Sequence, residues 1–423
     1  MSRCAGMLKV GMAGCLSLML VCGLVWSPAL AASNVTTLSV VYYYTSETEK
    51  DFIQKILDEY QQQHPNIKLD VQVTTQAKWP EIMTTRAIAK QLPDVAMSVP
   101  QRVGVWAAGG LLQDGREYIP KGVVEKFDQV RLLSDIYKGQ IVGFPVSSTV
   151  RAIAYNVDYF SKAGITPPRK ADEAWTWNQL VDVAKKVKAA SGARYALQFE
   201  KPSFDGWLPF LYQAGGQVLN EDGTKAAINS PQTRRALEWT AMLHKEGVAA
   251  PGIIEGTEDP LRTFVSGMST MWLATGNWMM PAIEPQMKFK WSFTFLPKDV
   301  GQATVVGGGD GIVFKGNHPR ESWDLVLTLV GPKYMGMWNT LLTSIPPRTD
   351  VQAQYAIKPE LGPFFAEQAR MMPKNLQLHQ LTPTYAASRD KLLQELSACV
   401  SGQQSADQTL AAMEKVVTEN LKK

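Results

Sequence analysis

The stretch from Trp207 to Leu243, WLPFLYQAGGQVLNEDGTKAAINSPQTRRALEWTAML, decides the fold of this 423-residue chain. Its apolar residues between Trp207 and Leu211 recur at helical spacing, and Gly215-Gly216 supplies the positive φ with which a helix ends. A short hairpin is predicted next, around the Asp222-Gly223 turn. Ser230-Pro231 then places an N-cap residue before a proline at the first helical position, which predicts a second helix.

The chain before this stretch alternates strand and helix. Extended apolar runs occur in LSVVYYYTS at 38–46, HPNIKLDVQV at 64–73 and LPDVAMS at 92–98, and amphipathic helices are predicted between them at 49–63 and 79–90. This β-α-β-α-β order predicts a doubly wound parallel sheet, with ligand-facing loops at the C-terminal ends of its strands.

The order of an aromatic helix, a double glycine, a hairpin and a helix containing ALEW resembles the signature segment of the family 1 extracellular solute-binding proteins of ABC importers. That family includes maltose-binding and glycerol-3-phosphate-binding proteins. PNIKLDV, LPDV, LLQDG and TSIPPR stand where the family has similar segments, and the resemblance covers roughly Leu38 to Arg348. It implies an α/β, two-lobed periplasmic-binding-protein fold of type II, whose lobes are joined by three crossings.

The crossings divide the chain into segments. The extended residues 139–156 resemble the first crossing, VVGGGDGIVF at 305–314 resembles the second, and Gly331-Pro332 would be the third. The prediction is a signal peptide at 1–31, an N-terminal lobe at 32–148 and 302–331, and a C-terminal lobe at 149–301 and 332–423. RKADEA at 169–174 is an insertion relative to the family and is expected to be a surface excursion.

The predicted signal peptide has the three parts that export requires. Arg3 and Lys9 form a positive n-region, 10–25 an apolar core, and Ala29-Leu30-Ala31 a small-x-small cleavage pattern. The mature chain is therefore expected to begin at Ala32. The alternatives are an uncleaved anchor and a lipoprotein.

Cysteine usage follows from this processing. Cys15 would carry the lipid in the lipoprotein alternative, because it follows a segment that loosely resembles a lipobox. After cleavage Cys399 is the only cysteine left, so the exported chain is expected to have no disulfide and to depend on its core for stability.

Composition and motifs argue against several function classes. The net charge of +4 falls to +2 without the two basic residues of the leader, which is too near neutral to predict a nucleic-acid partner. The four histidines lack the spacing of metal ligands, and phosphate loops and nucleophile elbows are missing, so no metal or cofactor is expected. We expect no enzyme, although spacing alone does not exclude a hydrolase with two carboxylates.

Aromatic side chains are the first candidates for ligand contacts. Tyr42 and Tyr44 end the first predicted strand, and each is either a core residue or a ligand contact. Trp207 and Trp278 stand where the family commonly has cleft residues, with a place in the core as the alternative. Such rings would stack on the apolar C–H faces of a sugar.

The polar candidates lie at the ends of extended runs and near the crossings: Ser98, Ser147, Asn277, Gly308, Gly309, Asp310 and Arg348. Hydroxyl and amide groups there could meet a polyol, and glycines let a ligand approach the backbone. An arginine would hold an anionic group. For Arg348 a surface or interlobe salt bridge is the alternative.

The function expected from the resemblance is ligand capture for an ABC importer in the periplasm, with a carbohydrate or sugar derivative as the cargo. The protein is expected to be a monomer that closes about its hinge and docks on membrane permease subunits. The alternatives are a non-sugar cargo such as a glycerol phosphate, a polyamine or an iron chelate, a glycan-acting envelope enzyme, and a sensor subunit that transports nothing.

Overall fold

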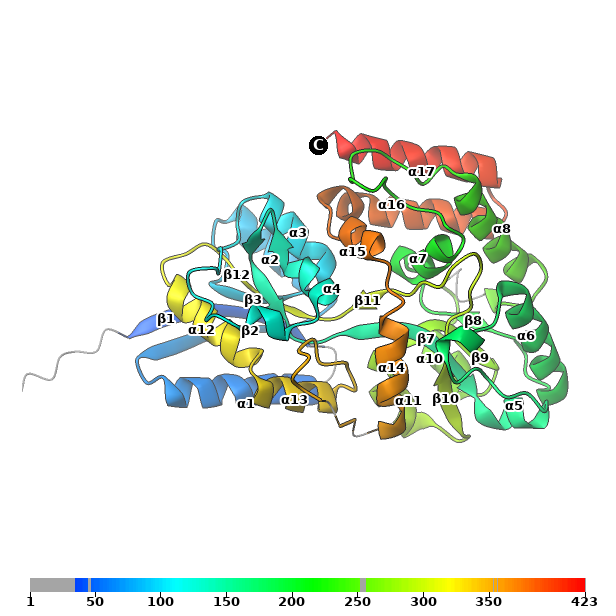
Figure 1. Cartoon of the computed structure of the whole chain (residues 1–423), viewed down its shortest axis with the longest axis horizontal. Helices are drawn as coiled ribbons and strands as arrows, with labels where there is room; N and C mark the ends of the chain where they lie inside the picture. Colours follow the sequence, from blue (N-terminus) through cyan, green and yellow to red (C-terminus); the bar gives the residue numbers. More distant parts are fainter. Residues whose placement is uncertain (1–34, 45–46, 252–255, 353, 356, 423) are drawn as a thin grey trace, which may run out of the picture.

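Two sheets with separate buried cores organise the molecule (Figure 1). The computed structural model describes residues 35–44, 47–251, 256–352, 354–355 and 357–422. Within these residues the chain forms two α/β lobes, as the sequence predicts. The signal peptide, its cleavage site and Cys15 lie outside the described residues.

The first lobe is built on a five-stranded sheet in the order β2-β1-β3-β12-β6. Its strands are β1 (Thr36–Tyr44), β2 (Ile67–Thr75), β3 (Val95–Ser98), β6 (Gly143–Pro145) and β12 (Asp310–Val313). β1 pairs in parallel with β2 and β3, whereas β12 runs antiparallel to β3 and β6. The three strands of the predicted β-α-β-α-β order therefore pair in parallel, as the sequence predicts, and β12 joins them in the antiparallel direction because it returns from the other lobe.

Helices cover the first sheet and supply its largest core side chains. They are α1 (Glu47–Gln63), α2 (Trp79–Ile88), α3 (Pro100–Ala108), α4 (Gln129–Leu132), α12 (Pro319–Leu329) and α13 (Pro332–Leu341). Tyr60 on α1, Trp323 on α12 and Trp338 on α13 are buried in one cluster with the strands. A small ribbon of β4 (Ile136–Tyr137) and β5 (Gln140–Ile141) lies beside it.

The second lobe is built on a sheet in the order β10-β7-β9-β8, with β11 pairing separately with β7. Its strands are β7 (Thr149–Asn156), β8 (Gln198–Phe199), β9 (Met271–Gly276), β10 (Trp291–Thr294) and β11 (Val306–Gly307). Its helices are α5 (Val157–Lys162), α6 (Trp177–Ser191), α7 (Phe204–Gln213), α8 (Pro231–Lys245), α10 (Pro260–Val265), α11 (Met280–Ile283), α14 (Gly362–Ala369), α15 (Lys374–Gln380), α16 (Pro383–Val400) and α17 (Ala406–Leu421). In Figure 1, α16 and α17 lie side by side above α7.

The stretch that decides the fold occupies the centre of the second lobe. Every residue of α7 is buried, which explains why its sequence is apolar on more than one face. Gly215 has a φ of 82° just after the helix, and the Ser230 side chain accepts a hydrogen bond from the backbone of Thr233 at the start of α8. The predicted hairpin is reduced to one bridge, between Leu219 and Ala226.

Three segments connect the lobes. The first joins β6 to β7 and the second joins β11 to β12, as predicted. The third crossing is predicted at Gly331-Pro332. The buried residues of α13, which follow this position, belong to the core of the first lobe, and the next residue buried in the core of the second lobe is Tyr355. This crossing therefore follows α13, because its tryptophan fills the first core. The other predicted lobe boundaries stay predictions.

The insertion at 169–174 is held against the second lobe rather than standing free. The Ala171 amide donates to Glu367 at 2.9 Å, and Lys298 Nζ donates to the Asp172 carbonyl at 2.7 Å. Cys399 is buried and unpaired among the described residues. In that part of the chain, none of the helices has the length and apolar character that crossing a membrane requires.

Candidate functional site

Beside the crossings, the two lobes meet where α3 packs against α16 and α4 against α15. Gly104 on α3 lies so close to the Leu381 carbonyl that a Cβ added to this glycine would be 1.9 Å from the oxygen. The C-terminal ends of β1 and β3 and the turn after β9 are the places where an α/β fold of this kind puts ligand-binding loops. The polar side chains on both sides of this interface are therefore the candidates for ligand contacts.

Arg151 is the central cation on the second-lobe side. It lies on the first crossing strand, β7, and its Nη1 donates to the Ala274 carbonyl at 2.6 Å. Ala274 has a φ of 58°, an uncommon backbone for a residue with a side chain. Burial lowers the pKa of Arg151, while the negative charges of Glu200 and Asp205 act in the opposite direction. Arg151 is therefore a cation surrounded by acids from two other segments.

Trp278 forms an aromatic surface beside this arginine. The Arg151 Cζ lies 5.3 Å from the centre of the Trp278 ring, within the range of a cation–π contact. The indole is partly exposed, whereas Asn277 before it is fully buried. Trp278 therefore has a face that a ligand could cover, as the sequence suggests.

Asp205 connects α7 to the C-terminal helices. Its Oδ1 accepts from the Tyr385 hydroxyl at 2.5 Å and from Gln380 Nε2 at 3.1 Å, and its Oδ2 lies 3.6 Å from Arg389 Nη1. The Arg389 side chain is 33% exposed, so part of its hydrogen-bonding capacity is open to a ligand.

Another arginine, Arg102, lies on the first-lobe helix that packs against α16, the helix of Arg389. Arg102 on α3 stacks on Trp79, with its Cζ 5.4 Å from the ring centre. Burial lowers the pKa of Arg102, and the positive charge of Arg389 lowers it further. We call Arg102, Arg151, Asp205, Tyr385 and Arg389 the interlobe cluster. Its members carry an excess of positive charge where the lobes meet.

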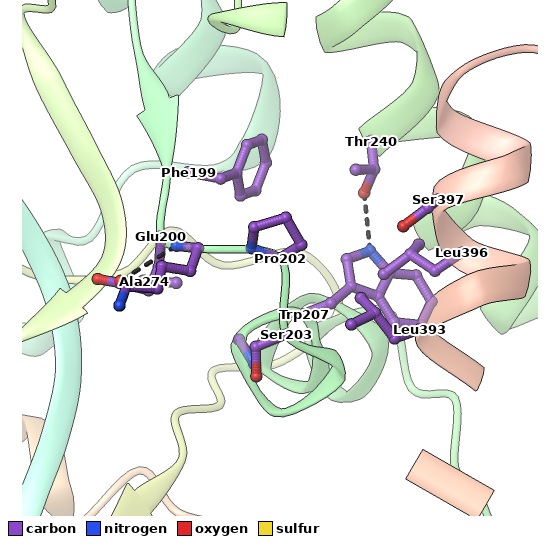
Figure 2. A pocket seen from close by; sticks show the side chains of 12 residues that line it. Phe199, Glu200, Pro202, Ser203, Trp207, Thr240, Ala274, Leu393, Leu396 and Ser397 are labelled. Carbon is purple, nitrogen blue, oxygen red and sulfur yellow. Dashed lines mark hydrogen bonds between the residues drawn. The ribbon is translucent and has the colours of Figure 1, made fainter. Parts of the chain in front are cut away.

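A pocket opens into the second lobe next to this cluster (Figure 2). It shares Glu200, Gly206 and Ala274 with the surroundings of Arg151. Its apolar wall comes from Trp207 and from α16. Burial raises the pKa of Glu200, whose carboxylate lies at the pocket.

Trp207 lies deeper than the sequence suggests. Figure 2 shows its indole between α8 and α16, where Nε1 donates to the Thr240 hydroxyl at 2.9 Å. The side chain is 3% exposed and belongs to the core of the second lobe, while one side of it lines the pocket. It is thus part of the pocket wall and lacks the free face of Trp278.

The strand-end candidates of the first lobe are mostly buried. Tyr42 is 1% exposed within the core, where burial raises its pKa to about 12. Tyr44 is partly exposed, with Lys50 Nζ 5.5 Å from its ring centre. Ser98 is fully buried, and its carbonyl accepts from the Tyr43 hydroxyl at 3.1 Å. Only Tyr44 of these predicted residues therefore offers a surface.

Ser147, Gly308 and Gly309 lie together at the crossings. The Ser147 hydroxyl accepts from the Gly309 amide at 3.0 Å. Gly308 has a φ of 137°, and a Cβ there would lie 2.0 Å from the Ser147 carbonyl oxygen. These residues join the first two crossings. Gly308 has to be a glycine for two reasons: its φ is positive, and a Cβ would collide with the Ser147 carbonyl.

Asn277 binds the crossings from the second-lobe side. Its Oδ1 accepts from the Val150 amide and its Nδ2 donates to the Thr343 carbonyl, both at 2.8 Å. It is fully buried, so its amide holds two chain segments together and does not face a ligand in this structure.

Asp310 and Arg348 are both engaged in ion pairs. Arg131 Nη2 lies 2.7 Å from Asp310 Oδ1, and both side chains are buried. Arg348 makes two bonds to Asp350, at 2.9 and 2.8 Å, and its Cζ lies 5.5 Å from the centre of the Phe127 ring. The salt-bridge alternative therefore describes Arg348, because a bidentate carboxylate already satisfies its guanidinium.

Sequence reasoning missed the interlobe cluster. Arg151 is a single cation within the apolar run TVRAIAYN, and this irregularity is a signal that could have indicated it. Asp205 follows the N-cap Ser203 and has the pattern of an ordinary acid in a first helical turn. Arg389 lies on a generic amphipathic helix, so its place opposite Arg102 depends on tertiary structure alone.

Metal chemistry has little support in the described part of the chain. No group of three or more histidine, cysteine, aspartate or glutamate residues there could hold an ion. The polar groups of the interlobe cluster and the aromatic surfaces beside it are instead suited to holding a small polar molecule.

Several known proteins are similar to this chain. A multiple sugar-binding protein of Streptococcus mutans is 21% identical over 351 residues, which cover 74% of this chain and 76% of that protein. The sn-glycerol-3-phosphate-binding periplasmic protein of Escherichia coli K12 is 28% identical over 199 residues, 43% of each chain.

Solved structures share the fold. The GacH receptor of Streptomyces glaucescens, whose structure is known without ligand and with acarbose, superimposes with a TM-score of 0.77 at 20% identity and covers 92% of this chain and 99% of that one. The profile of the bacterial extracellular solute-binding proteins matches residues 44–335. Because this match spans more than half of the sequence and includes the first two crossings, the chain belongs to the family of bacterial extracellular solute-binding proteins.

Proposed function

We propose that this protein is the periplasmic solute-binding component of an ABC importer and that it carries a sugar or sugar derivative between its lobes. Membership in the family supports capture without reaction, so the protein is not an enzyme. The proposal further includes export through the N-terminal segment, a monomeric state and docking of the closed form on permease subunits.

The partly exposed indole of Trp278 beside Arg151 is the observation that carries the choice of cargo. Sugar rings combine apolar C–H faces with many hydroxyl groups, so they need both an aromatic surface and a dense set of donors and acceptors. Trp278 supplies the first, and Arg389, whose side chain is partly exposed and positioned by Asp205, supplies donors on the same lobe. The relatives named as sugar-binding proteins favour the same class.

Thermal shift and titration calorimetry test this cargo. A panel of mono- and oligosaccharides, sugar phosphates, polyols and polyamines is screened first, since a ligand at a hundred times its Kd adds roughly 2.7 kcal/mol of stability. For a sugar found in this way, Trp278→Ala is expected to cost on the order of 2 kcal/mol of binding free energy. Trp175→Ala is the control, because this partly buried tryptophan packs on Phe160 elsewhere in the second lobe. Full-strength binding by Trp278→Ala would contradict the stacking argument.

An anionic cargo such as a sugar phosphate or glycerol phosphate is the second candidate. Arg102 and Arg389 belong to opposite lobes, and a bound anion near both would relieve the repulsion that lowers the pKa of Arg102. For such a cargo Arg389→Ala should weaken binding more than Trp278→Ala does, with an effect that diminishes as salt is added. Arg348→Ala should have little effect on binding, because Asp350 engages Arg348.

A further inference from the structure

Arg131 lies at the centre of a buried ion cluster beneath the crossings. It is 3% exposed and comes from α4, while Asp135 and Asp310 beside it are fully buried. Its guanidinium lies 2.7 Å from Asp310 Oδ1 and 3.9 Å from Asp135 Oδ2. Ser134 completes the cluster, accepting from Arg131 and donating to Asp135 Oδ2 at 2.9 Å. None of these groups belongs to the interlobe cluster.

The same guanidinium also binds the backbone of two crossings. Arg131 Nη2 donates to the Ser147 carbonyl of the first crossing at 3.2 Å and to the Gly309 carbonyl of the second at 3.0 Å. The crossings also bind each other here, because the Val146 amide donates to the Gly309 carbonyl at 2.9 Å. One charged side chain therefore fixes two chain segments that are distant in the sequence.

The crossings are paired again on the second-lobe side. Thr149 pairs with Gly307 and Val150 with Val306, and Asn277 holds the Val150 amide. Two residues lie between these fixed regions: Ser148 on the first crossing and Gly308 on the second. Ser148 pairs with Ile345, which belongs to the segment after α13. Gly308 is the residue with a φ of 137°, a conformation available mainly to glycine.

We propose that Arg131 is a positioning residue for interlobe motion: it clamps the first two crossings at their first-lobe ends and so confines bending to Ser148 and Gly308. Without the clamp, the first-lobe ends of the two crossings would be held together by the bonds of Gly309 to Val146 and Ser147, and bending would extend over a longer segment. The lobes would then sample more relative orientations, and fewer of these would place Arg102 opposite Arg389. This role goes beyond the proposed function, since it concerns the hinge and applies whatever the cargo is.

The side chains of Asp135 and Asp310 differ in their charge state in this cluster. Burial, and next the neighbouring Asp310, raise the pKa of Asp135 well above its usual range, which favours the protonated acid there. Arg131 is then the counterion of Asp310, whose strand β12 begins the first-lobe part of the second crossing. Asp135→Asn keeps a neutral side chain of the same shape and is the matched control for changes at Arg131.

Hydrogen exchange measured by mass spectrometry on the ligand-free protein tests the clamp. Arg131→Lys keeps the charge but lacks the planar fork that reaches Asp310 and both carbonyls. Exchange in peptides covering 143–150 and 303–313 should become about tenfold faster or more, because bonds from charged donors are lost there. Peptides from α17 should exchange as in the wild type, and Asp135→Asn should leave the crossings unchanged.

Three results would overturn the proposal. The first is that the crossings of Arg131→Lys exchange at the wild-type rate. The second is that exchange in β1 and the rest of the first lobe becomes faster by the same factor as at the crossings, because a general packing role of Arg131 would produce that pattern. If Arg131→Lys does not fold, the double variant Arg131→Met/Asp310→Asn replaces it, because it removes the guanidinium without leaving Asp310 as an unpaired buried charge. Wild-type exchange of the 143–150 and 303–313 peptides in this double variant would then refute the clamp. Because no ligand is used, a failed search for cargo does not affect this outcome.

Discussion

Replacing Gly104 by alanine should separate binding from stability. Gly104 lies within α3, and an added Cβ would be 1.9 Å from the carbonyl oxygen of Leu381, at the end of α15 in the other lobe. An ordinary contact begins at 3.4 Å, so α3 and α15 would have to move apart by about 1.5 Å. The obstacle is a backbone oxygen, which has no rotamer with which to withdraw. The change therefore acts on the contact between the lobes.

The size of the effect follows from two opposing terms. Overpacking of this kind costs typically about 1–3 kcal/mol, and here the cost falls on the state in which the lobes touch. Cargo affinity should therefore fall by roughly 5- to 150-fold. With the lobes apart the same change favours folding, because alanine is better than glycine in a helix interior by about 1 kcal/mol.

Titration calorimetry with the cargo measures the loss of affinity. Denaturant unfolding in the absence of cargo measures the free energy of unfolding. The expected result is weaker binding together with an unchanged or slightly higher free energy of unfolding. Gly109→Ala is the control on the same helix, since the nearest atom to its added Cβ is a leucine side-chain carbon at 3.5 Å. Wild-type affinity in Gly104→Ala would show that cargo binding does not require this contact between the lobes.

Three further changes test individual assignments. Burial lowers the pKa of His244 to about 4, below its ordinary 6.5, so the stability this ring contributes is complete above pH 6.5 and is lost as the pH falls toward 4. Between pH 7 and pH 4.5 the wild type should lose about 2–3 kcal/mol more unfolding free energy than His244→Phe, and equal losses would refute the assignment. Cys399→Ser should lower the unfolding free energy by about 1–2 kcal/mol and leave cargo affinity unchanged in calorimetry, whereas loss of binding would contradict its place in the core. Arg348→Ala should lower the melting temperature, because Asp350 loses its partner. A larger loss of cargo affinity in this variant than in Trp278→Ala would show that Arg348 contacts the cargo.

The order of elements in each lobe could be predicted from the sequence because it depends on local signals. Apolar periodicity, Ser230-Pro231 and Gly215 define α7 and α8 closely. The error at the third crossing concerns packing between distant segments. The third crossing follows α13 and does not lie at Gly331-Pro332, because α13 packs in the core of the first lobe. No local pattern indicates in which core a helix will pack.

The candidate site depends still more on tertiary structure. Trp207 and Trp278 belong to the same lobe, and their local sequences do not indicate which of the two side chains is buried. The difference arises because α16, almost two hundred residues further along the chain, covers Trp207 and leaves Trp278 partly exposed. Arg389 on that helix is likewise placed by packing. The hinge glycines were easier to predict, since a glycine cluster in a strand indicates a close backbone approach.

The position of β12 determines the order in which the protein can fold. This strand lies between β3 and β6, yet all the strands of the second lobe, β7 to β11, separate it from both in sequence. Pairings between such distant residues form slowly, because a long loop must close before they contribute any stability. As the chain is synthesised, β3 and β6 therefore have unpaired edges until Val313 is available. The first lobe begins the sequence, but its sheet can be completed only after the strands of the second lobe, β7 to β11, have been synthesised.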